Sequence, residues 1–336
     1  MSQFRIGVIG LGRIGRFHAE TLNDLPRVGS LVLADAVPEV AEVAARKLDA
    51  EAVADPLAMI TSGIDGLVIA AGTASHPELI AAGVDAGVPV FCEKPVAPTT
   101  AESAELLRAV GVRDVPIQMG HQRRFDPAYR AIWQAVRDGD VGWLHTIRST
   151  TLDPEPPPAP FIASSAGIFP DCGVHDFDVV RWISGREVVE VYAVGANRGD
   201  AFFAEAGDVD TAAATLLLED GTIAVISNAR YNGGGYDCRL EVHGSRGTLV
   251  AGWDDRSPVR STEQGGGDIG RDPHRMFMVR FEAAYRAEFE AFLDVVAGDA
   301  SSPCTVQDAV AAGRIAEAAT TSLKEHRPVR VSEVAA

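Results

Sequence analysis

A lysine in a short turn is the first residue of this chain whose type and position could do chemistry. Lys94 stands in the sequence Glu93-Lys94-Pro95, directly after an apolar run at residues 89–92. A lysine at the mouth of a cleft can hydrogen-bond a reacting hydroxyl and tune its proton affinity, although most loop lysines are only solvated charges. Pro95 can fix the geometry of this turn, including through a cis peptide bond.

A second candidate group surrounds a histidine. Asp171, His175 and Asp178 are spaced i, i+4 and i+7 in a segment that enters an amphipathic helix, where this spacing places side chains on one face. A carboxylate could orient the imidazole while its other nitrogen exchanges a proton with substrate near neutral pH. The residues alone leave two alternatives open, a helix cap with a surface histidine and a divalent-metal site. Further His or Cys ligands at recognisable spacing are missing, so we expect no metal.

A glycine-rich turn predicts a dinucleotide site. The sequence Gly10-Leu11-Gly12-Arg13-Ile14-Gly15 follows an apolar run at residues 4–9 and opens a helical pattern. The first glycine permits a tight turn, the second lets the backbone approach a pyrophosphate, and the third allows close packing of helix and strand. Asp35 ends the next apolar run, twenty residues after Gly15, where a carboxylate can bind ribose hydroxyls. A 2′-phosphate there would meet a negative charge, which favours NAD.

The turn after a third apolar run, at residues 66–70, adds Thr73 and His76. We expect both to contact ribose or the nicotinamide phosphate, with packing at the helix start as the alternative for His76. The full set of expected cofactor contacts is Gly10, Gly12, Arg13, Ile14, Gly15, Asp35, Thr73, His76, Glu93 and Lys94.

The elements that must position these residues fall into two domains. Up to residue 121, apolar runs alternate with helical patterns. The apolar runs predict strands at residues 4–9, 30–34, 66–70, 89–92 and 117–119. The helical patterns predict helices at residues 12–25, 37–48, 76–86 and 99–110. This order predicts an α/β Rossmann domain, a doubly wound parallel sheet. Residues 122–336 contain strand patterns between 144 and 251 and two late amphipathic helices near 276–296 and 305–324. They predict an α+β domain with a large, mostly antiparallel open sheet.

Composition excludes several classes of protein. The formal net charge of −17 opposes binding to nucleic acid or anionic lipid. No apolar run reaches the roughly 20 residues of a membrane span, and the first residues do not form a signal peptide, so we expect a cytoplasmic protein. The four cysteines are far apart in the sequence and predict neither a disulfide framework nor a zinc site.

Taken together, the glycine turn with Asp35, the sequence Glu93-Lys94-Pro95 and the Asp171 to His175 segment resemble the Gfo/Idh/MocA oxidoreductases over essentially the whole chain. The segment from Gln122 to Pro127 is most similar to that of the inositol 2-dehydrogenase branch. The resemblance implies that Lys94 binds the reacting hydroxyl, Asp171 contacts substrate and supports the base, and His175 is the general acid/base. It also implies that Arg123 and Asp178 line the polyol pocket and that the open sheet forms a homo-oligomer, a tetramer or a dimer.

The expected function is therefore NAD-dependent oxidation of a secondary hydroxyl of a cyclic polyol or sugar, such as myo-inositol or scyllo-inositol, to the ketone. Two alternatives remain at this point. One is an NAD-dependent glycosidase that oxidises its sugar only transiently, and the other is a non-catalytic dinucleotide-sensing regulatory protein.

Overall fold

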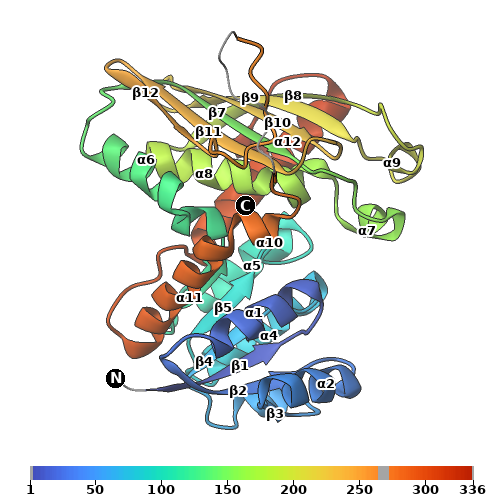
Figure 1. Ribbon diagram of the computed structural model, residues 1–336, viewed down its shortest axis with the longest axis vertical. Coiled ribbons are helices and arrows are strands. Elements are labelled where there is room, and N and C mark those ends of the chain that lie inside the picture. Colours follow the sequence, from blue (N-terminus) through green and yellow to red (C-terminus); the bar gives the residue numbers. More distant parts are fainter. Residues whose placement is uncertain (1–2, 264–271, 335–336) are drawn as a thin grey trace. The chain divides into compact units, whose positions relative to one another are not determined.

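The computed structural model describes residues 3–263 and 272–334, which form two compact units (Figure 1). The first unit contains the residues up to Gln122 together with Ala283–Val310. The second contains Arg123–Glu282 and the residues from Ala311 onward. The expected boundary after residue 121 lies next to the observed division. The expectation of one uninterrupted domain over 122–336, however, does not describe Ala283–Val310, which pack with the first unit.

The first unit is built on a six-stranded sheet whose paired strands all run parallel. Its order is β3-β2-β1-β4-β5-β6. The strands are β1 (Phe4–Ile9), β2 (Val28–Ala34), β3 (Glu51–Ala52), β4 (Gly66–Ile69), β5 (Val90–Glu93) and β6 (Ile117–Gly120). This is the doubly wound Rossmann order, in which ligands bind outside the carboxyl ends of the strands where the order reverses, between β1 and β4. The predicted α/β Rossmann fold is confirmed.

Helices cover both faces of this sheet because its strands are apolar on both sides. Ile6 and Val8 of β1 belong to a core shared with α1, α2 and α11, whereas the next residue along, Ile9, belongs to a core shared with α3, α4 and α5. The helices of the unit are α1 (Arg13–Asn23), α2 (Pro38–Leu48), α3 (Pro56–Ile60), α4 (His76–Asp85), α5 (Thr100–Val110) and α11 (Glu282–Ala297). Phe289, Phe292 and Leu293 of α11 are fully buried in the first of these cores, which explains why this late helix belongs to the first unit.

The second unit contains a seven-stranded sheet of order β12-β11-β7-β10-β9-β8-β13. Its strands are β7 (Leu144–Leu152), β8 (Val188–Ala196), β9 (Thr211–Leu218), β10 (Ile223–Ala229), β11 (Asp237–Gly244), β12 (Gly247–Ala251) and β13 (Val329–Arg330). Strands β7 and β10 pair in parallel, and the other pairs are antiparallel. The predicted large, mostly antiparallel sheet is confirmed.

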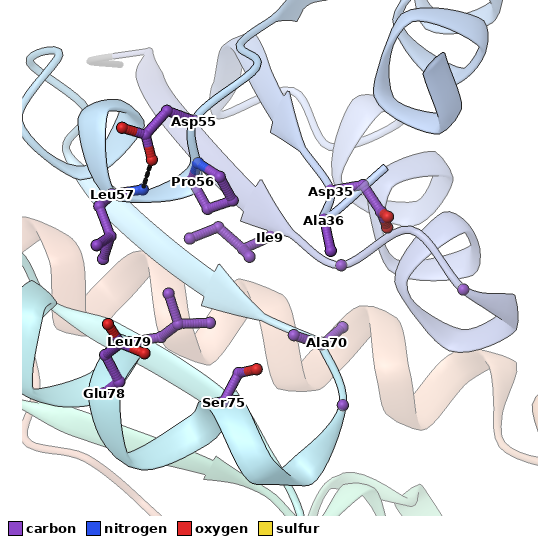
Figure 2. Close-up of a pocket in the computed structure, with 14 residues that line it drawn as sticks. Ile9, Asp35, Ala36, Asp55, Pro56, Leu57, Ala70, Ser75, Glu78 and Leu79 are labelled. Atoms are coloured by element: carbon purple, nitrogen blue, oxygen red, sulfur yellow. Dashed lines mark hydrogen bonds between the residues drawn. The ribbon is translucent and has the colours of Figure 1, made fainter. Parts of the chain in front are cut away.

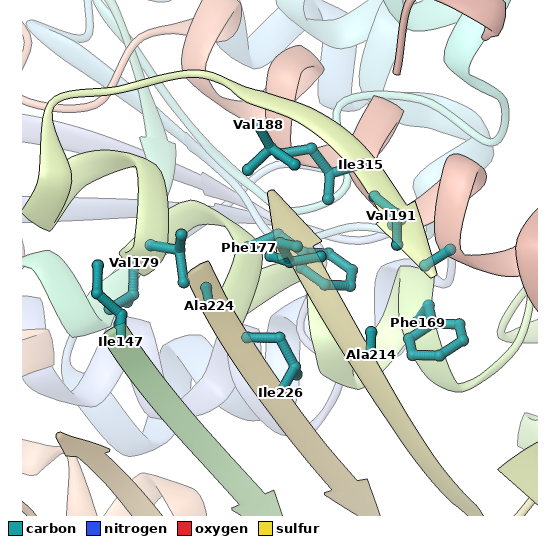
Figure 3. Close-up of a cluster of buried hydrophobic side chains, with 14 of the residues drawn as sticks. Ile147, Phe169, Phe177, Val179, Val188, Val191, Ala214, Ala224, Ile226 and Ile315 are labelled. Atoms are coloured by element: carbon teal, nitrogen blue, oxygen red, sulfur yellow. The ribbon is translucent and has the colours of Figure 1, made fainter. Parts of the chain in front are cut away.

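One face of the second sheet is covered by α6 (Pro127–Arg137), α8 (Val174–Ser184) and α12 (Val306–Glu325), the last of these from residue 311 onward. Along β9 the buried and exposed residues alternate strictly, as expected for a sheet covered on one side. Figure 3 shows side chains of the strands, including Ala214, Ala224 and Ile226, meeting Phe177 of α8. The shorter helices are α7 (Ala159–Ser164), α9 (Phe202–Glu205) and α10 (Phe277–Arg280).

None of the helices in the described part of the chain has the length and apolar character that a bilayer crossing requires.

Candidate cofactor and catalytic site

The glycine turn between β1 and α1 has the geometry that a dinucleotide cradle requires. Gly10 has a φ of +88°, and a Cβ at this position would lie 2.5 Å from the Cα of Ala71. A Cβ on Gly15 would lie 1.8 Å from the carbonyl oxygen of Gly10, so only glycine lets α1 begin so close to β1. At Gly12, by contrast, a Cβ would meet no atom within 4 Å. The open space beside Gly12 is where a pyrophosphate can approach the N-terminal amides of α1.

A pocket of about 480 Å³ extends from this turn along the carboxyl ends of the parallel strands. In Figure 2, side chains from the start of α3 lie on one side of it and side chains from α4 lie on the other, with Asp35 and Ala36 at one end. The lining residues include Ile9, Gly10, Gly12, Asp35, Ala36, Asp55, Pro56, Leu57, Ala70, Ser75, Glu78 and Leu79. Apolar side walls and a carboxylate at one end suit an adenine ring and a ribose diol. The residues present therefore fit the adenosine half of NAD.

Asp35 is held in place at this pocket by the backbone. Its two carboxylate oxygens accept hydrogen bonds from the amide of Leu11 at 2.7 Å and from the amide of Val37 at 3.0 Å. These bonds fix the carboxylate between the glycine turn and the end of β2, so it needs no side-chain partner to stay oriented. Asp55 and Glu78 also line the pocket, and three carboxylates disfavour an additional phosphate on the ribose.

The turn that carries Lys94 follows β5, at the same carboxyl edge of the sheet as the glycine turn. The Lys94–Pro95 peptide bond is cis, as the sequence allowed. Glu93 is only 13% exposed at its side chain, and its carboxylate meets His18 of α1, with 2.6 Å between Oε1 and Nε2. Burial by itself would raise the pKa of Glu93, but the hydrogen bond from His18 and the nearby Lys94 hold this pKa below its usual range. Lys94 therefore follows a buried, ionised carboxylate.

His76 has a different surrounding from the one expected. Its ring is almost fully buried at the start of α4, with Nδ1 2.7 Å from the carbonyl oxygen of Pro95 and Nε2 3.1 Å from that of Ala71. Both ring nitrogens thus lie near backbone carbonyl oxygens, of which a neutral imidazole can donate to one, and the ring lies between the turn after β4 and the turn after β5. This packing agrees with the alternative of a histidine packed at the helix start, and a direct contact between its ring and the cofactor stays a prediction. Thr73 lies in the short turn just before, half-buried.

The segment of Asp171 and His175 is helical but not a single α-helix. Residues Phe169–Gly173 form a π-helical turn, and α8 begins at Val174. Asp171 therefore lies in the wider turn, and His175 lies in the first turn of α8, both half-buried. π-Helical turns are rare and often occur at functional sites, because they redirect side chains relative to the regular helix.

Asp171 forms an ion pair that sequence reasoning did not anticipate. Arg230, at the end of β10, donates from Nη2 to Asp171 at 2.8 Å and from Nη1 to Asp153 at 3.0 Å. The guanidinium is almost completely buried. Desolvation raises the pKa of Asp153, and the charge and hydrogen bonds of Arg230 offset this only in part. Arg230 thus holds Asp171 from the sheet side and ties the proline-rich segment after β7 to it.

Arg123 and Asp178, which the resemblance assigns to the polyol pocket, lie inside the framework of the second unit. Arg123 donates to Asp176 at 2.7 Å and to Thr151 at 2.9 Å, and it is 1% exposed. Asp178 is fully buried and accepts two hydrogen bonds from Arg124, at 2.6 and 2.9 Å. Asp178 therefore does not share the half-buried environment of His175, although the i+3 spacing suggested a common accessible face. The resemblance predicts direct contact of Arg123 and Asp178 with substrate, and their buried ion pairs favour the alternative of a role in the framework of the second unit.

Other site residues were missed by the sequence analysis. The pocket wall formed by Asp55, Pro56 and Leu57 had a signal, because an aspartate followed by proline is typical of a helix N-terminus. Asp55 does cap α3 through its contact with the amide of Leu57. His18 and Arg230 had no such local signal, since their partners lie 75 and 59 residues away in the sequence. Within the described residues, no group of three or more His, Cys, Asp or Glu side chains could hold a metal ion.

Both halves of the chain match families of known proteins. Residues 4–121 match the family described as an oxidoreductase family with an NAD-binding Rossmann fold, and residues 129–250 match the GFO/IDH/MocA C-terminal domain. A myo-inositol 2-dehydrogenase of Thermotoga maritima is 36% identical, with 98% of this chain and 99% of the relative covered. The scyllo-inositol 2-dehydrogenase (NAD+) of Bacillus subtilis is 32% identical, with 98% and 96% covered.

A solved structure of a related enzyme has the same fold. The scyllo-inositol dehydrogenase of Lactobacillus casei, determined with bound NAD(H) and scyllo-inositol, superposes with a TM-score of 0.87 at 29% sequence identity. The superposition covers 98% of this chain and 100% of that one.

Proposed function

This chain belongs to the Gfo/Idh/MocA family of NAD-dependent oxidoreductases, and from that premise we propose that it oxidises one secondary hydroxyl of a cyclic polyol to the ketone. The preferred substrates are myo-inositol and scyllo-inositol, on which relatives that match over nearly the whole chain are named to act. The observation that carries the proposal is the cofactor pocket at Asp35, with a lysine turn at the same edge of the sheet.

Bound NAD supplies the hydride acceptor of the reaction. In this proposal His175 removes the proton of the hydroxyl that is oxidised, because an imidazole is the side chain best suited to proton exchange near neutral pH. Lys94 donates a hydrogen bond to the same oxygen and stabilises the negative charge that develops on it. Asp171, held by Arg230, contacts the polyol and supports His175.

We assign Arg123 and Asp178 to the framework behind the polyol pocket rather than to its surface. Both are buried in ion pairs with partners inside the second unit. A substitution of either is then expected to act by displacing α8, which carries His175 and Asp178, and not by removing one contact to substrate. A crystal structure with NAD and an inositol tests the assigned roles of Lys94 and His175 directly.

A substrate panel is the central experiment. Purified protein is mixed with NAD or NADP and with myo-inositol, scyllo-inositol or common aldoses, and NADH or NADPH formation is followed by absorbance. We expect NADH to accumulate with at least one inositol, and much less product with NADP. Sugar turnover without net NADH would instead indicate the transient oxidation of a glycosidase. Tight NAD binding without turnover of any compound would indicate a regulatory protein.

Single substitutions test the assigned roles. Lys94→Ala and His175→Ala should each lower kcat by about 10²–10⁴-fold, while NAD binding measured by calorimetry stays largely intact. Lys47→Ala is the matched control, because Lys47 is an exposed lysine of the same unit that pairs only with Glu20 in the described contacts. Wild-type turnover in either active-site variant would refute the assignment.

The outer face of the second sheet supports a homo-oligomer. Apolar side chains remain exposed there on the neighbouring strands β8, β9 and β10: Tyr192, Val194, Leu217, Ile223 and Val225. Exposed apolar side chains on adjacent strands are typical of an interface between copies of a chain. We propose a dimer or tetramer formed through it, and Val225→Arg should reduce the mass measured by light scattering. The expected cytoplasmic location is part of the same proposal, and cell fractionation tests it.

A further inference from the structure

His18 is a polar side chain in a site built for an apolar one. It lies on the buried face of α1 and is 0% exposed. Aromatic rings surround it, with centroids at 4.9 Å for Phe289, 5.5 Å for Tyr285 and 5.9 Å for Phe91. Burial of an imidazole among such rings costs free energy unless a hydrogen bond compensates. A leucine or phenylalanine would fill this position at lower cost, so packing alone does not explain a histidine here.

The imidazole makes one polar contact, and that contact leads to the lysine turn. Nε2 lies 2.6 Å from Oε1 of Glu93, whereas Nδ1 has no hydrogen-bond partner among the described residues. The second carboxylate oxygen of Glu93 accepts a hydrogen bond from the backbone amide of Lys94 at 3.3 Å. The contacts therefore run in one direction, from α1 through the carboxylate to the residue that carries the ammonium group.

The same turn is also held from its other side. A Cβ on Gly120 would lie 3.1 Å from both Cδ and Oε2 of Glu93, so the carboxylate packs against the backbone of β6 in space that a larger residue would need. On the far side of Lys94, the ring of His76 contacts the carbonyl oxygen of Pro95. Two buried histidines thus contact the residues immediately before and after Lys94, which fixes the direction in which the backbone presents this side chain.

We propose that the His18–Glu93 pair is a positioning device for Lys94, which holds the lysine turn so that the ammonium group meets the reacting hydroxyl. The inference rests on the proposed function, because it assigns Lys94 to that hydroxyl. His18 and Glu93 are positioning residues that act through Lys94, and neither needs to touch the substrate. The lowered pKa of Glu93 keeps the carboxylate in the ionised form that accepts both hydrogen bonds.

The energetics favour this role over a purely stabilising one. A buried ion pair or charged hydrogen bond is weak evidence for stability, because desolvation cancels much of the attraction and an apolar pair of similar volume is often as stable. Geometry is more demanding at a reacting group, where a displacement of about 1 Å can cost about 10²-fold in rate. Contacts that fix the turn should therefore affect kcat more than they affect the free energy of unfolding.

Two substitutions at position 18 separate the hydrogen bond from the packing. His18→Phe keeps a ring in the aromatic surrounding but removes the donor to Glu93, and we expect kcat to fall about 10–100-fold with NAD affinity unchanged. His18→Gln restores an N–H donor near the position of Nε2 and should recover most of the lost turnover. Phe292→Leu is the control, because it creates a cavity in the same core, where Phe292 packs on Phe91 rather than on Glu93.

A spectroscopic measurement reports on the turn without any turnover. The chain contains three lysines, Lys47, Lys94 and Lys324, so protein grown with [ε-¹³C]lysine gives three side-chain NMR signals. The Lys94 signal is assigned by its loss in Lys94→Arg. In the cofactor-free protein we expect it to lie apart from the signals of the two exposed lysines, to move towards them in His18→Phe, and to return in His18→Gln.

The outcomes separate this inference from the proposed function. If His18→Phe leaves both kcat and the Lys94 signal unchanged, the inference is overturned while polyol oxidation stands. It is also overturned if His18→Phe and Phe292→Leu lower kcat in proportion to their loss of thermal stability and leave the Lys94 signal unmoved. If the wild-type protein oxidises no polyol, the proposed function fails and the link to the reacting hydroxyl fails with it. The lysine spectra then decide whether the pair holds the turn.

Discussion

Gly12→Ala and Gly15→Ala, two substitutions in the same glycine turn, should affect different properties. The first should weaken NAD binding, and the second should lower the stability of the fold. A Cβ at Gly15 would come within 1.8 Å of the carbonyl oxygen of Gly10 and within 3.2 Å of the Cβ of Ala70. The nearer of these atoms belongs to the backbone, so no side-chain rotation relieves a contact that real Cβ atoms avoid below 3.0 Å. At Gly12 the added methyl group meets nothing within 4 Å, and the backbone has a φ of −64° that alanine adopts readily.

The magnitudes follow from this difference in space. Overpacking typically costs about 1–3 kcal/mol, and Gly15→Ala belongs at or above the upper end because α1 must move away from β1. A loss of about 3 kcal/mol lowers the melting temperature by about 6–12 °C for a unit of this size. Gly12→Ala should stay within about 1 kcal/mol of the wild-type stability. Its methyl group instead occupies the space beside the helix amides, and we expect NAD affinity to fall at least about tenfold, or about 1.4 kcal/mol.

Thermal unfolding of the cofactor-free variants and calorimetric titration with NAD measure both quantities. The expected pattern is a folded Gly12→Ala variant that binds NAD poorly and a Gly15→Ala variant that unfolds at lower temperature. The reasoning is refuted if Gly12→Ala binds NAD as tightly as the wild type, or if Gly15→Ala melts at the wild-type temperature.

Three further predictions follow from contacts of single carboxylates. Asp35→Ala should weaken NAD binding by about 1.5–3 kcal/mol, because the ribose loses its hydrogen-bond acceptor. It should also reduce the preference for NAD over NADP, measured as the ratio of kcat/KM with the two cofactors. An unchanged preference would contradict the assignment of Asp35 to the ribose. Asp176→Ala leaves the buried guanidinium of Arg123 without its counter-charge and should cost about 3–5 kcal/mol in urea unfolding, so a loss below 1 kcal/mol would argue against the buried pair. Glu93 has a lowered pKa in the folded protein, so it contributes stability above its ordinary pKa of about 4.3 that is lost as the pH falls towards the folded value. Glu93→Gln should therefore differ from the wild type most at pH 7 and least in acid, and a difference that does not depend on pH would sink this explanation.

Much of the fold follows from local sequence patterns, because these patterns record which faces of an element are buried. The apolar runs at residues 4–9 and 66–70 predict strands buried on both sides, and β1 and β4 lie at the centre of the first sheet. The β-like run at residues 211–218 predicts a strand, but its residue types do not alternate, and only the structure shows that buried and exposed positions alternate along β9. The glycine turn was predictable because each glycine answers a steric requirement within a few residues of itself.

Local patterns show that a face is buried, but they do not show which other element it packs against. The amphipathic helix near residues 276–296 was expected in the second domain, but α11 packs its phenylalanines against the first sheet. The parallel pairing of β10 with β7 likewise depends on the path of the chain between them and not on the composition of either strand.

The same division applies to the candidate site. By itself the sequence determined which residue types stand at the ends of strands, among them Asp35 and Lys94, because a residue at a strand end is placed by its own strand. Only the tertiary structure decided which groups meet across long separations, as His18 and Glu93 do, and which charged residues are buried in ion pairs, as Asp178 is with Arg124. The physical reason is that hydrogen bonds and ion pairs depend on distances of a few ångströms, and those distances exist only once the packed elements have brought remote parts of the chain together.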